Sequence, residues 1–426
     1  GASSKEEYWD NLLNKKECIT RIPIEKLKEL NIPQEIIGNP RYMPISLEID
    51  GKGLFDNEFF NISPKDAEYM NPQTRLLLEN SWKALEDAGY VSNQVSNTGV
   101  YIATSNNSYL SSDNARETTM VDSSKSYVKW IMNQPGTVPT TLSYHLGLTG
   151  PSIAVHSNCS SALAALDLAS QAIKKGEIDY ALVGAATIHA KEGRGYLYVP
   201  GMNFSEKGHI KAFDSDADGM LGGEGVAVIM IKNAKKAIRD HDNIYAILRG
   251  MSVSNDGKEK AGYYAPSIRG QEIAIENAIV KADINPETIS YIEAHGTGTK
   301  LGDPIEFQAL KHVYEKYTMK KQFCGIGSVK TNVGHLDTVA GIAGCIKLAL
   351  SLKHKIIPAT INFKEPNPEI DLENSPFYIQ NEILDLSKHK SPIRVALSSF
   401  GIGGTNVHAI LEEYIENILC SYISCK

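Results

Sequence analysis

The stretch Val155-His156-Ser157-Asn158-Cys159-Ser160-Ser161-Ala162-Leu163 decides both the fold and the chemistry of this chain. Residues 151–155 before it suit a short strand, and residues 160–175 after it carry apolar side chains at helical spacing, with Gly176 as a stop. Cys159 is therefore predicted at a turn from strand to helix. Unpaired N–H groups and the positive end of the helix dipole favour a thiolate there, so we expect its pKa to lie below the ~8.5 of a free thiol. A buried structural cysteine is the alternative interpretation.

Size and composition exclude several classes of protein. The 426 residues can form two domains or one large α/β unit, and 42% hydrophobic with 22% charged residues is typical of a soluble globular protein. A net charge of −7 argues against nucleic acid as the main partner. No apolar run approaches the ~18 residues of a membrane span, and the charged N-terminus lacks a signal-peptide core. Six scattered cysteines without zinc or CxxC spacing indicate a reduced, cytoplasmic protein without a metal site.

Strand and helix patterns alternate along the chain, which indicates an α/β protein. Helices are predicted at 5–13, 70–88, 232–239, 269–282 and 304–316. Strands are predicted at 99–103, 180–184, 226–231, 244–248, 289–293, 395–398 and 407–412. Residues 105–140 are polar and are predicted to be an irregular loop.

One unit of the chain is repeated. Residues 325–329 are predicted to form a strand, residues 330–335 a polar turn, and residues 338–352 a helix of small residues, as around Cys159 roughly 175 positions earlier. Two such halves facing each other would bring the two polar turns to a shared centre.

Two histidines in glycine-rich turns complete a set of reactive side chains. His295 and His335 each follow a predicted strand, and either one alone is more often structural than catalytic. Together with Cys159 they suit acyl-thioester chemistry, in which a thiol holds an acyl group and two donors stabilise an enolate oxygen. Lys330 would tune the electrostatics near His335, with a solvated lysine as the alternative; the apolar strand before it predicts partial burial.

Other catalytic patterns are absent from the sequence. There is no GxSxG, no HExxH and no phosphate-binding GxxxxGK[ST], and residues 401–404 do not form a GxGxxG fingerprint. These absences argue against serine hydrolase, zinc protease and nucleotide-dependent chemistry.

Several motifs, in this order along the chain, resemble those of the β-ketoacyl synthase family, and most closely the ketosynthase domain of modular type I polyketide synthases. They are Asn71-Pro72-Gln73 with 75–79, Cys159-Ser160-Ser161, Ala217-Asp218-Gly219, Glu293 to Thr299 with Gly302-Asp303-Pro304, Lys330 to His335, and Ser399 to Asn406. The match covers nearly the whole chain.

The resemblance implies an α/β thiolase-like fold of two pseudo-equivalent halves in an α/β/α/β/α five-layer sandwich. The halves would be residues 1–243 with the nucleophile and 244–413 with the histidines, followed by a tail or linker at 414–426. It further implies a homodimer and neighbouring polyketide synthase domains, with no membrane or nucleic-acid partner. The sequence departs from the family in three ways: His156 stands where the family usually has Asp, Thr140-Thr141 replaces an Asn-Arg pair that is common before the Ser-Tyr motif (here Ser143-Tyr144), and the family's opening strand is missing.

The resemblance also implies a reaction. Cys159 would take an acyl chain from the phosphopantetheine of an acyl carrier protein, and His295, His335 and Lys330 would serve decarboxylative condensation with a malonyl-type extender. The N–H groups of Cys159 and Phe400 would form the oxyanion hole, with Phe400 also gating the pocket. Substrate-binding residues would be Thr297, Thr299, Gly401 and Gly403. No bound cofactor is implied, because the phosphopantetheine arrives with the substrate.

Alternatives remain at this point. A fatty-acid elongating 3-oxoacyl-[acyl-carrier-protein] synthase shares the same motifs. A non-condensing ketosynthase that only transfers acyl chains is another possibility, although loss of one histidine would favour it and both are present. An acidic carrier protein would need a basic docking patch, for which the lysine-rich stretches at 232–239 and 316–321 are candidates, with solvated helix faces as the alternative.

Overall fold

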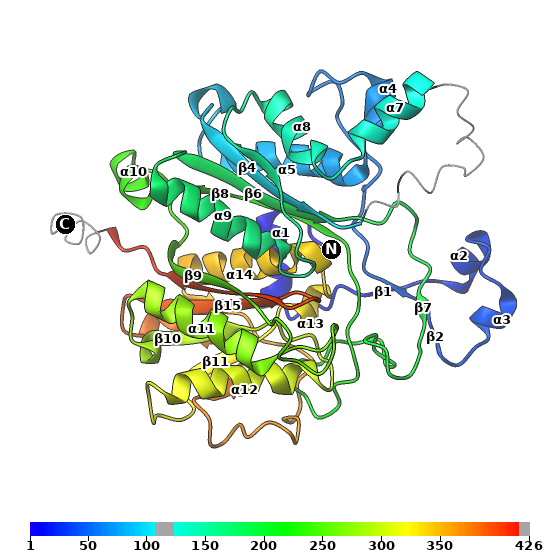
Figure 1. Ribbon diagram of the computed structural model, residues 1–426. Coiled ribbons are helices and arrows are strands. Elements are labelled where there is room, and N and C mark those ends of the chain that lie inside the picture. Colours follow the sequence, from blue (N-terminus) through cyan, green and yellow to red (C-terminus); the bar gives the residue numbers. More distant parts are fainter. Residues whose placement is uncertain (107–108, 110–122, 417–426) are drawn as a thin grey trace.

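Three layers of helices enclose two β-sheets in the computed structural model, which describes residues 1–106, 109 and 123–416 (Figure 1). The N-terminal sheet lies between an outer pair of helices, α5 (Pro72–Asp87) and α8 (Thr137–Leu146), and a central pair, α9 (Ser161–Lys175) and α14 (Ala340–His354). The C-terminal sheet lies between the central pair and the outer helices α11 (Ile268–Ala282) and α12 (Gly302–Glu315). This is the expected order α/β/α/β/α.

The two sheets share one pattern of strands. The N-terminal sheet has the order β5 (Ser152–Ala154), β4 (Thr98–Thr104), β6 (Tyr180–Thr187), β8 (Gly225–Lys232). The C-terminal sheet has the order β13 (Phe377–Ile379), β11 (Cys324–Gly327), β10 (Ile289–Glu293), β15 (Arg394–Phe400), β16 (Thr405–Glu412), β9 (Ile247–Asn255). In each sheet a central strand, β4 or β10, is parallel to both of its neighbours. Beyond one of these neighbours lies an antiparallel strand: β8 pairs with β6, and β16 pairs with β15.

The halves differ at one edge. In the C-terminal sheet β9 pairs antiparallel with β16, whereas within the described residues no strand pairs with the corresponding edge of β8. A groove of about 530 Å³ runs there, lined by β8, residues 244–248 and α14.

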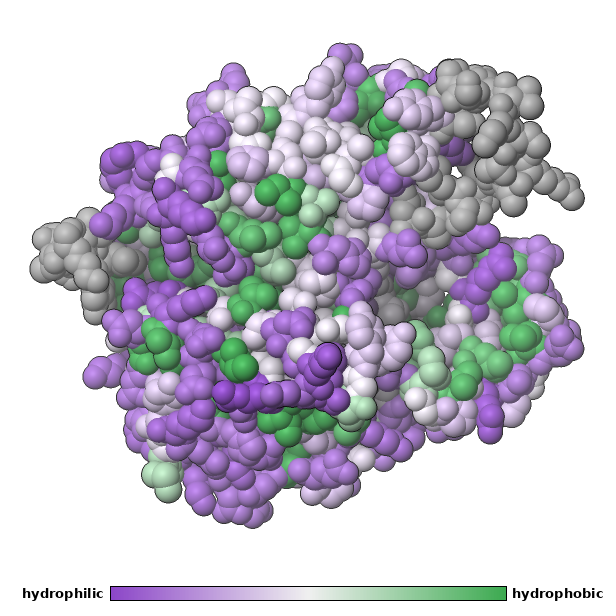
Figure 2. Space-filling model, viewed as in Figure 1, coloured by the Kyte–Doolittle hydropathy of each residue, from purple (hydrophilic) through white to green (hydrophobic). Residues whose placement is uncertain are grey.

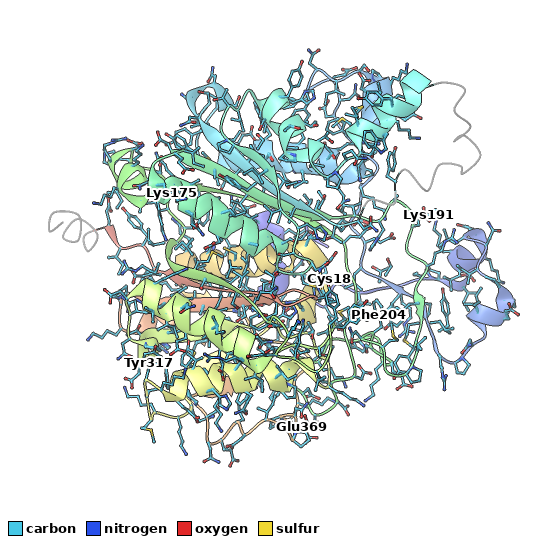
Figure 3. The ribbon with its side chains drawn as sticks, in the orientation of Figure 1. Cys18, Lys175, Lys191, Phe204, Tyr317 and Glu369 are labelled. Carbon is cyan, nitrogen blue, oxygen red and sulfur yellow. The ribbon has the colours of Figure 1, made fainter. Side chains whose placement is uncertain are left out.

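Close packing of the two central helices positions the nucleophile. Leu163 of α9 lies against Gly341 of α14, where an added Cβ would lie 2.6 Å from the Leu163 side chain, so only glycine fits. Gly176 ends α9 in the left-handed conformation, as predicted. Figure 3 places Lys175, at this end of α9, on the outside of the molecule, so the opposite end with Cys159 points inward.

Smaller elements complete the fold. The helices are α1 (Lys5–Leu13), α2 (Ile24–Glu29), α3 (Gln34–Ile37), α4 (Pro64–Tyr69), α7 (Ser123–Met132), α10 (Ala234–Arg239) and α13 (Lys330–Val333). The short strands are β1 (Thr20–Arg21), β2 (Tyr42–Met43), β3 (Ile45–Ser46), β7 (Tyr196–Leu197), β12 (Ile356–Ile357) and β14 (Leu384–Asp385). Figure 2 shows a largely hydrophilic face with apolar side chains gathered over α2, α3 and β7, where Ile24 and Leu197 are exposed.

Most predicted elements are confirmed within a few residues, and two expectations are wrong. The polar stretch 105–140 is not wholly irregular, because α7 and α8 begin inside it. The strand predicted at 244–248 begins only at Ile247. Residues 244–246 line the groove beside β8 and do not join the sheet. Residues 107–108 and 110–122, and the tail with Cys420 and Cys425, lie outside the described residues. Where the structure is described, no helix combines the length and the apolar character needed to cross a membrane.

A buried ion pair joins α14 to the C-terminal sheet. Lys347 Nζ lies 2.7 Å from Glu293 Oε2 and 2.9 Å from the Tyr291 hydroxyl, and both charged side chains are almost fully buried. We predict that Lys347→Met lowers the free energy of unfolding by about 3–5 kcal/mol, because Glu293 is left as a buried charge without its partner. Urea unfolding monitored by circular dichroism measures the change.

Lys320→Met is the matched control, because Lys320 pairs with Glu287 at the surface, 2.6 Å away with the lysine 65% exposed. Such a pair contributes only ~0–1 kcal/mol. Equal effects of the two substitutions would contradict the prediction.

Candidate active site

The backbone turns sharply just before Cys159. Asn158 has φ 56°, a left-handed conformation that asparagine tolerates better than most residues. The hydroxyl of Ser161 accepts a hydrogen bond of 2.8 Å from the Ser157 N–H and donates one of 2.5 Å to the Asn158 carbonyl. The first turn of α9 therefore holds the loop that presents the thiol.

The two halves meet at this turn. The Ser399 hydroxyl, at the end of β15, donates to the Cys159 carbonyl over 2.8 Å, and the Asn158 side-chain amide donates to the Ile402 carbonyl over 2.6 Å. Cys159 Sγ lies 3.9 Å from an oxygen of Asp337, on the turn after α13. The expected shared centre of the two polar turns is confirmed.

Main-chain contacts fix the ring of His335. Gly334 has φ 79°, and the His335 N–H donates 2.7 Å to the Leu221 carbonyl. The Asp337 N–H donates to His335 Nδ1 over 3.0 Å. Nδ1 of a neutral ring must then be the acceptor, so the proton sits on Nε2, which is free to donate into the site.

His295 is held in a comparable way. Glu306 of α12 accepts the N–H groups of His295 and Gly296, each over 2.8 Å. The Phe400 N–H approaches His295 Nδ1 at 3.4 Å, which again leaves the proton on Nε2. The rings of His295 and His335 lie 5.4 Å apart, nearly perpendicular, and the Phe400 ring lies 5.7 Å from His295.

Burial makes both imidazoles neutral. It lowers the pKa of His335 to about 3 and that of His295 well below its usual value, and the positive charge of Lys330 adds to both shifts. Lys330 itself is buried, 4% exposed, which exceeds the partial burial that we predicted. Burial lowers the pKa of Lys330, while the nearby carboxylates of Glu293 and Glu306 oppose that shift.

The expected low pKa of Cys159 is wrong for this structure. Burial raises it to about 11, the charge of Asp337 adds to the rise, and a backbone hydrogen bond and Lys330 only partly offset it. The turn does lie at a helix N-terminus, but the thiol is 7% exposed, so loss of hydration outweighs the dipole. Cys324 and Cys345 are also buried with raised pKa values.

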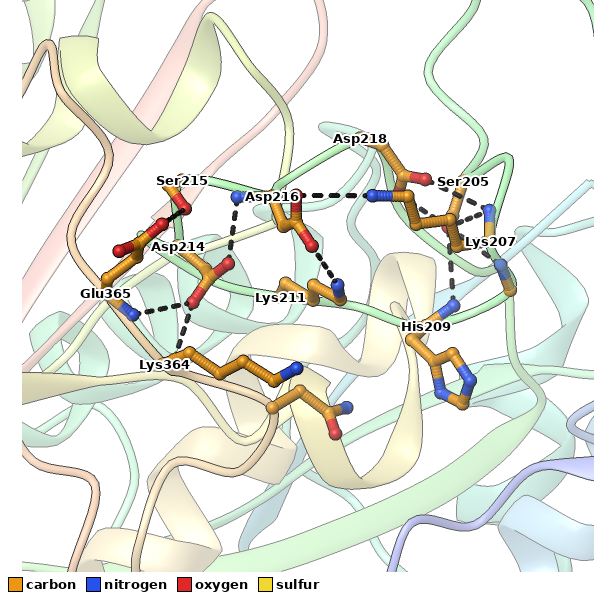
Figure 4. A network of polar contacts seen from close by, with 12 residues as sticks. Ser205, Lys207, His209, Lys211, Asp214, Ser215, Asp216, Asp218, Lys364 and Glu365 are labelled. Atoms are coloured by element: carbon orange, nitrogen blue, oxygen red, sulfur yellow. Dashed lines mark hydrogen bonds and ion pairs between the residues drawn. The ribbon is translucent and has the colours of Figure 1, made fainter.

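A polar loop supports the segment with Thr297 and Thr299. The two threonine hydroxyls lie 3.1 Å apart, and the Gly219 N–H donates to the carbonyl of Gly298 between them over 2.9 Å. Figure 4 shows the network that holds residues 205–218 of this loop. In it, Asp214 accepts the N–H of Lys364 over 2.6 Å. The loop is thereby tied to the chain that precedes β13.

The glycine-rich loop 401–404 packs directly on the nucleophile turn. A Cβ at Gly401 would overlap the Ser157 carbonyl oxygen and lie 2.7 Å from Ser160 Oγ. Gly403 has φ 99°, where other residues would be strained, and it faces the Tyr263 hydroxyl.

Most cations of the two lysine-rich stretches are paired with acids. Lys232 pairs with Asp240 and Asp242, Lys236 with Asp179, Lys316 with Glu276 and Lys320 with Glu287. The interpretation as solvated, ion-paired surface is the better one for both. Among the residues whose placement is described, no group of three or more His, Cys, Asp or Glu side chains could hold a metal ion.

Sequence reasoning gave no role to three acids that shape the site, although Asp303 belongs to one of the quoted motifs. Asp337 contacts the thiol, and Glu306 and Asp303 of α12 hold the His295 loop, with Asp303 accepting the N–H of Gly298 over 3.1 Å. The spacing of Asp303 and Glu306 at i and i+3 on a helix was the available signal for those two. No local pattern indicated Asp337.

Family models match the chain in three consecutive parts. The β-ketoacyl synthase N-terminal domain matches residues 1–237, its C-terminal domain residues 245–364, and the ketoacyl-synthetase C-terminal extension residues 366–421. The chain belongs to the β-ketoacyl synthase family. It is thus an enzyme of the acyltransferase class, with the predicted thiolase-like fold.

Relatives place it among ketosynthase domains of polyketide synthases. It is 56% identical to polyketide synthase PksN of Bacillus subtilis over 98% of this chain but only 8% of that protein. Ketosynthase twelve of the bacillaene polyketide synthase from Bacillus amyloliquefaciens is 54% identical with a TM-score of 0.94, covering 97% of this chain and 73% of that one. The module 1 ketosynthase of the bacillaene synthase from the same species is 53% identical with a TM-score of 0.91, covering 97% and 74%.

We predict that Gly401→Ala reduces acylation of Cys159 at least ~10²-fold, because the new methyl group displaces the turn that holds the nucleophile, and small displacements of reacting groups have effects of this size. Intact-mass detection of the acyl adduct measures it. Gly53→Ala is the control, since a Cβ at Gly53 meets nothing within 4 Å. An unaffected rate in Gly401→Ala would refute the packing argument.

Proposed function

We propose that this family member condenses an acyl chain held on Cys159 with a malonyl-type extender carried by an acyl carrier protein, in polyketide biosynthesis. The observation that carries the proposal is the pair of buried, neutral imidazoles beside a buried thiol, each with Nδ1 facing a main-chain N–H. Two Nε2–H donors can therefore converge on one oxygen. This is the requirement of an enolate intermediate.

The reaction follows from these groups. Cys159 first exchanges its thiol proton for the acyl group of a phosphopantetheine thioester. The extender then loses carbon dioxide, and its enolate oxygen accepts hydrogen bonds from His295 and His335. The enolate carbon attacks the acyl carbon, and Cys159 leaves as thiolate. During that attack the N–H groups of Cys159 and Phe400 would hold the carbonyl oxygen, which requires the long Phe400 contact to His295 to give way.

The substrate arm and partners are part of the same proposal. Thr297, Thr299, Gly401 and Gly403 would border the phosphopantetheine, which arrives on the carrier protein, so that no resident cofactor is needed. Neighbouring domains of a cytoplasmic polyketide synthase would supply the carrier. We place the division between the halves at 243/244, with the C-terminal half ending at 413. The polyketide relatives favour this role over fatty-acid elongation, and the retained histidine pair favours condensation over acyl transfer alone.

A homodimer through the edge of the N-terminal sheet is proposed as well. β5 is the outermost strand of that sheet, and Ile153 on it and Tyr144 on α8 are 42% and 82% exposed. An apolar sheet edge of this kind is normally covered. We predict that Ile153→Asp yields monomers in light scattering after size exclusion, whereas Ile383→Asp, at an exposed loop position, does not. A monomeric wild-type protein would contradict this arrangement.

The histidines should separate the two half-reactions. We predict that His295→Ala and His335→Ala still form acyl-Cys159, while ketoacyl product falls by ~10²–10³, because each removes one donor to the enolate oxygen. Cys159→Ala should lose acylation and retain decarboxylation of malonyl thioester. Intact mass and carbon dioxide release, measured on all three variants, give the readout.

Near wild-type condensation by His335→Ala would refute the proposed mechanism. Loss of acylation in both histidine variants would instead show that the rings act on the thiol.

A further inference from the structure

The Asp337 carboxylate contacts the nucleophile, and the mechanism above gives it no role. Its Oδ1 lies 3.9 Å from Cys159 Sγ, within the range of a hydrogen bond from a thiol. It follows His335 by two residues, so it belongs to the other half of the molecule from Cys159.

The backbone of Asp337 is strained. Its φ is 48°, in the left-handed region that side-chain-bearing residues rarely adopt. In this conformation its N–H donates to His335 Nδ1 over 3.0 Å, while its carboxylate faces the thiol. One residue thereby orients the imidazole and contacts the nucleophile, and strain of this kind concentrates at functional sites.

The surroundings make a proton acceptor necessary. With a pKa of about 11, Cys159 is a thiolate in only about one molecule in 10⁴ at pH 7. Burial also raises the pKa of Asp337 above its usual value, whereas attraction to His156 and the contact with Cys159 oppose the rise, and His189 adds a smaller attraction. His335, whose Nδ1 accepts the Asp337 N–H, and His295 beside it are also ionisable, and Lys330 favours the Cys159 thiolate.

We propose that Asp337 is a catalytic residue of the acylation step, accepting the Cys159 proton as the sulfur attacks the thioester. This rests on the proposed acylation of Cys159. The S–H bond breaks as the bond from Sγ to the acyl carbon forms, and the proton moves to Oδ1 of Asp337. The bond from the acyl carbon to the pantetheine sulfur then breaks, and Asp337 returns the proton to that leaving sulfur. Asp337 ends ionised, and no further reactant is consumed.

His156 lies near Asp337 and interacts with its carboxylate. It stands where the family usually has an acid, three residues before the cysteine, and it is exposed. Its attraction to Asp337 favours the ionised carboxylate.

The test is Asp337→Asn, which keeps the size of the side chain and suits the left-handed backbone. Acylation by an acyl-pantetheine thioester is followed by intact mass between pH 6 and 10, and alkylation of Cys159 by iodoacetamide is followed in parallel. We expect acylation at pH 7 to fall at least ~10²-fold, the typical contribution of a general base. The gap to wild type should narrow as pH rises toward 11, because the thiolate then forms unaided.

Alkylation separates catalysis from structural damage. It consumes preformed thiolate, whose fraction rises once the negative charge of Asp337 is removed, so iodoacetamide should label Asp337→Asn at least as fast as wild type. Asp371→Asn is the matched control, because Asp371 lies at the surface beside Lys311. The Asp371→Asn variant should show wild-type rates of both acylation and alkylation.

Two results would overturn the proposal while acylation of Cys159 stands: wild-type acylation at pH 7 by Asp337→Asn, or an equal fall in acylation and alkylation. Failure of the wild-type protein to form any acyl-Cys159 adduct would instead overturn the proposed function, and the role of Asp337 with it.

Discussion

Burial of the Lys330 ammonium between the two halves is the constraint on which the chemistry of the site depends. A cation excluded from water needs carboxylates nearby, and Glu293, Glu306 and Asp303 all act on it. Those same carboxylates hold the main chain around the histidines: Glu293 accepts the Val329 N–H over 2.6 Å, and Glu306 accepts that of His295. Burial keeps both imidazoles unprotonated, and the positive charge of Lys330 adds to this effect. The carboxylates that compensate the charge of Lys330 therefore also position the main chain around the histidines.

The repeat of a strand, a polar turn and a helix explains why such a cluster can exist in the interior. Each half alone would expose the face of its central helix, and α9 packed on α14 covers both. Because the polar turns follow the ends of buried strands, they are enclosed when the halves meet, and water is excluded from both at once. The thiol from one half and the imidazoles from the other then share a medium in which hydrogen bonds and charges act strongly.

Sequence reasoning succeeded where the determinants are local. Helix α9, its glycine stop and the turn at Cys159 follow from short-range pattern, and the motifs around His295 and His335 identified the family. It failed for the pKa of Cys159, because the helix dipole is visible in the sequence whereas the burial that outweighs it comes from packing against β15 and the turn after His335. Asp337 was missed for the same reason, since its contact with Cys159 spans 178 positions of the chain. The helices inside 105–140 were missed because polar residues on their exposed sides hid the buried Val138 and Leu142.

A resting thiol rather than a thiolate has a consequence for the direction of the reaction. Transfer of an acyl group to Cys159 replaces a buried ionisable group with a neutral thioester, which the low-polarity surroundings tolerate well. Expelling Cys159 as thiolate is correspondingly unfavourable, because the charge would form where hydration is lost. In the proposed reaction, the acyl chain would therefore be held until a strong carbon nucleophile arrives, and irreversible loss of carbon dioxide would supply that nucleophile. In the proposed reaction, burial of the sulfur would also protect the acyl-enzyme from hydrolysis, because water is excluded from the acyl carbon before condensation.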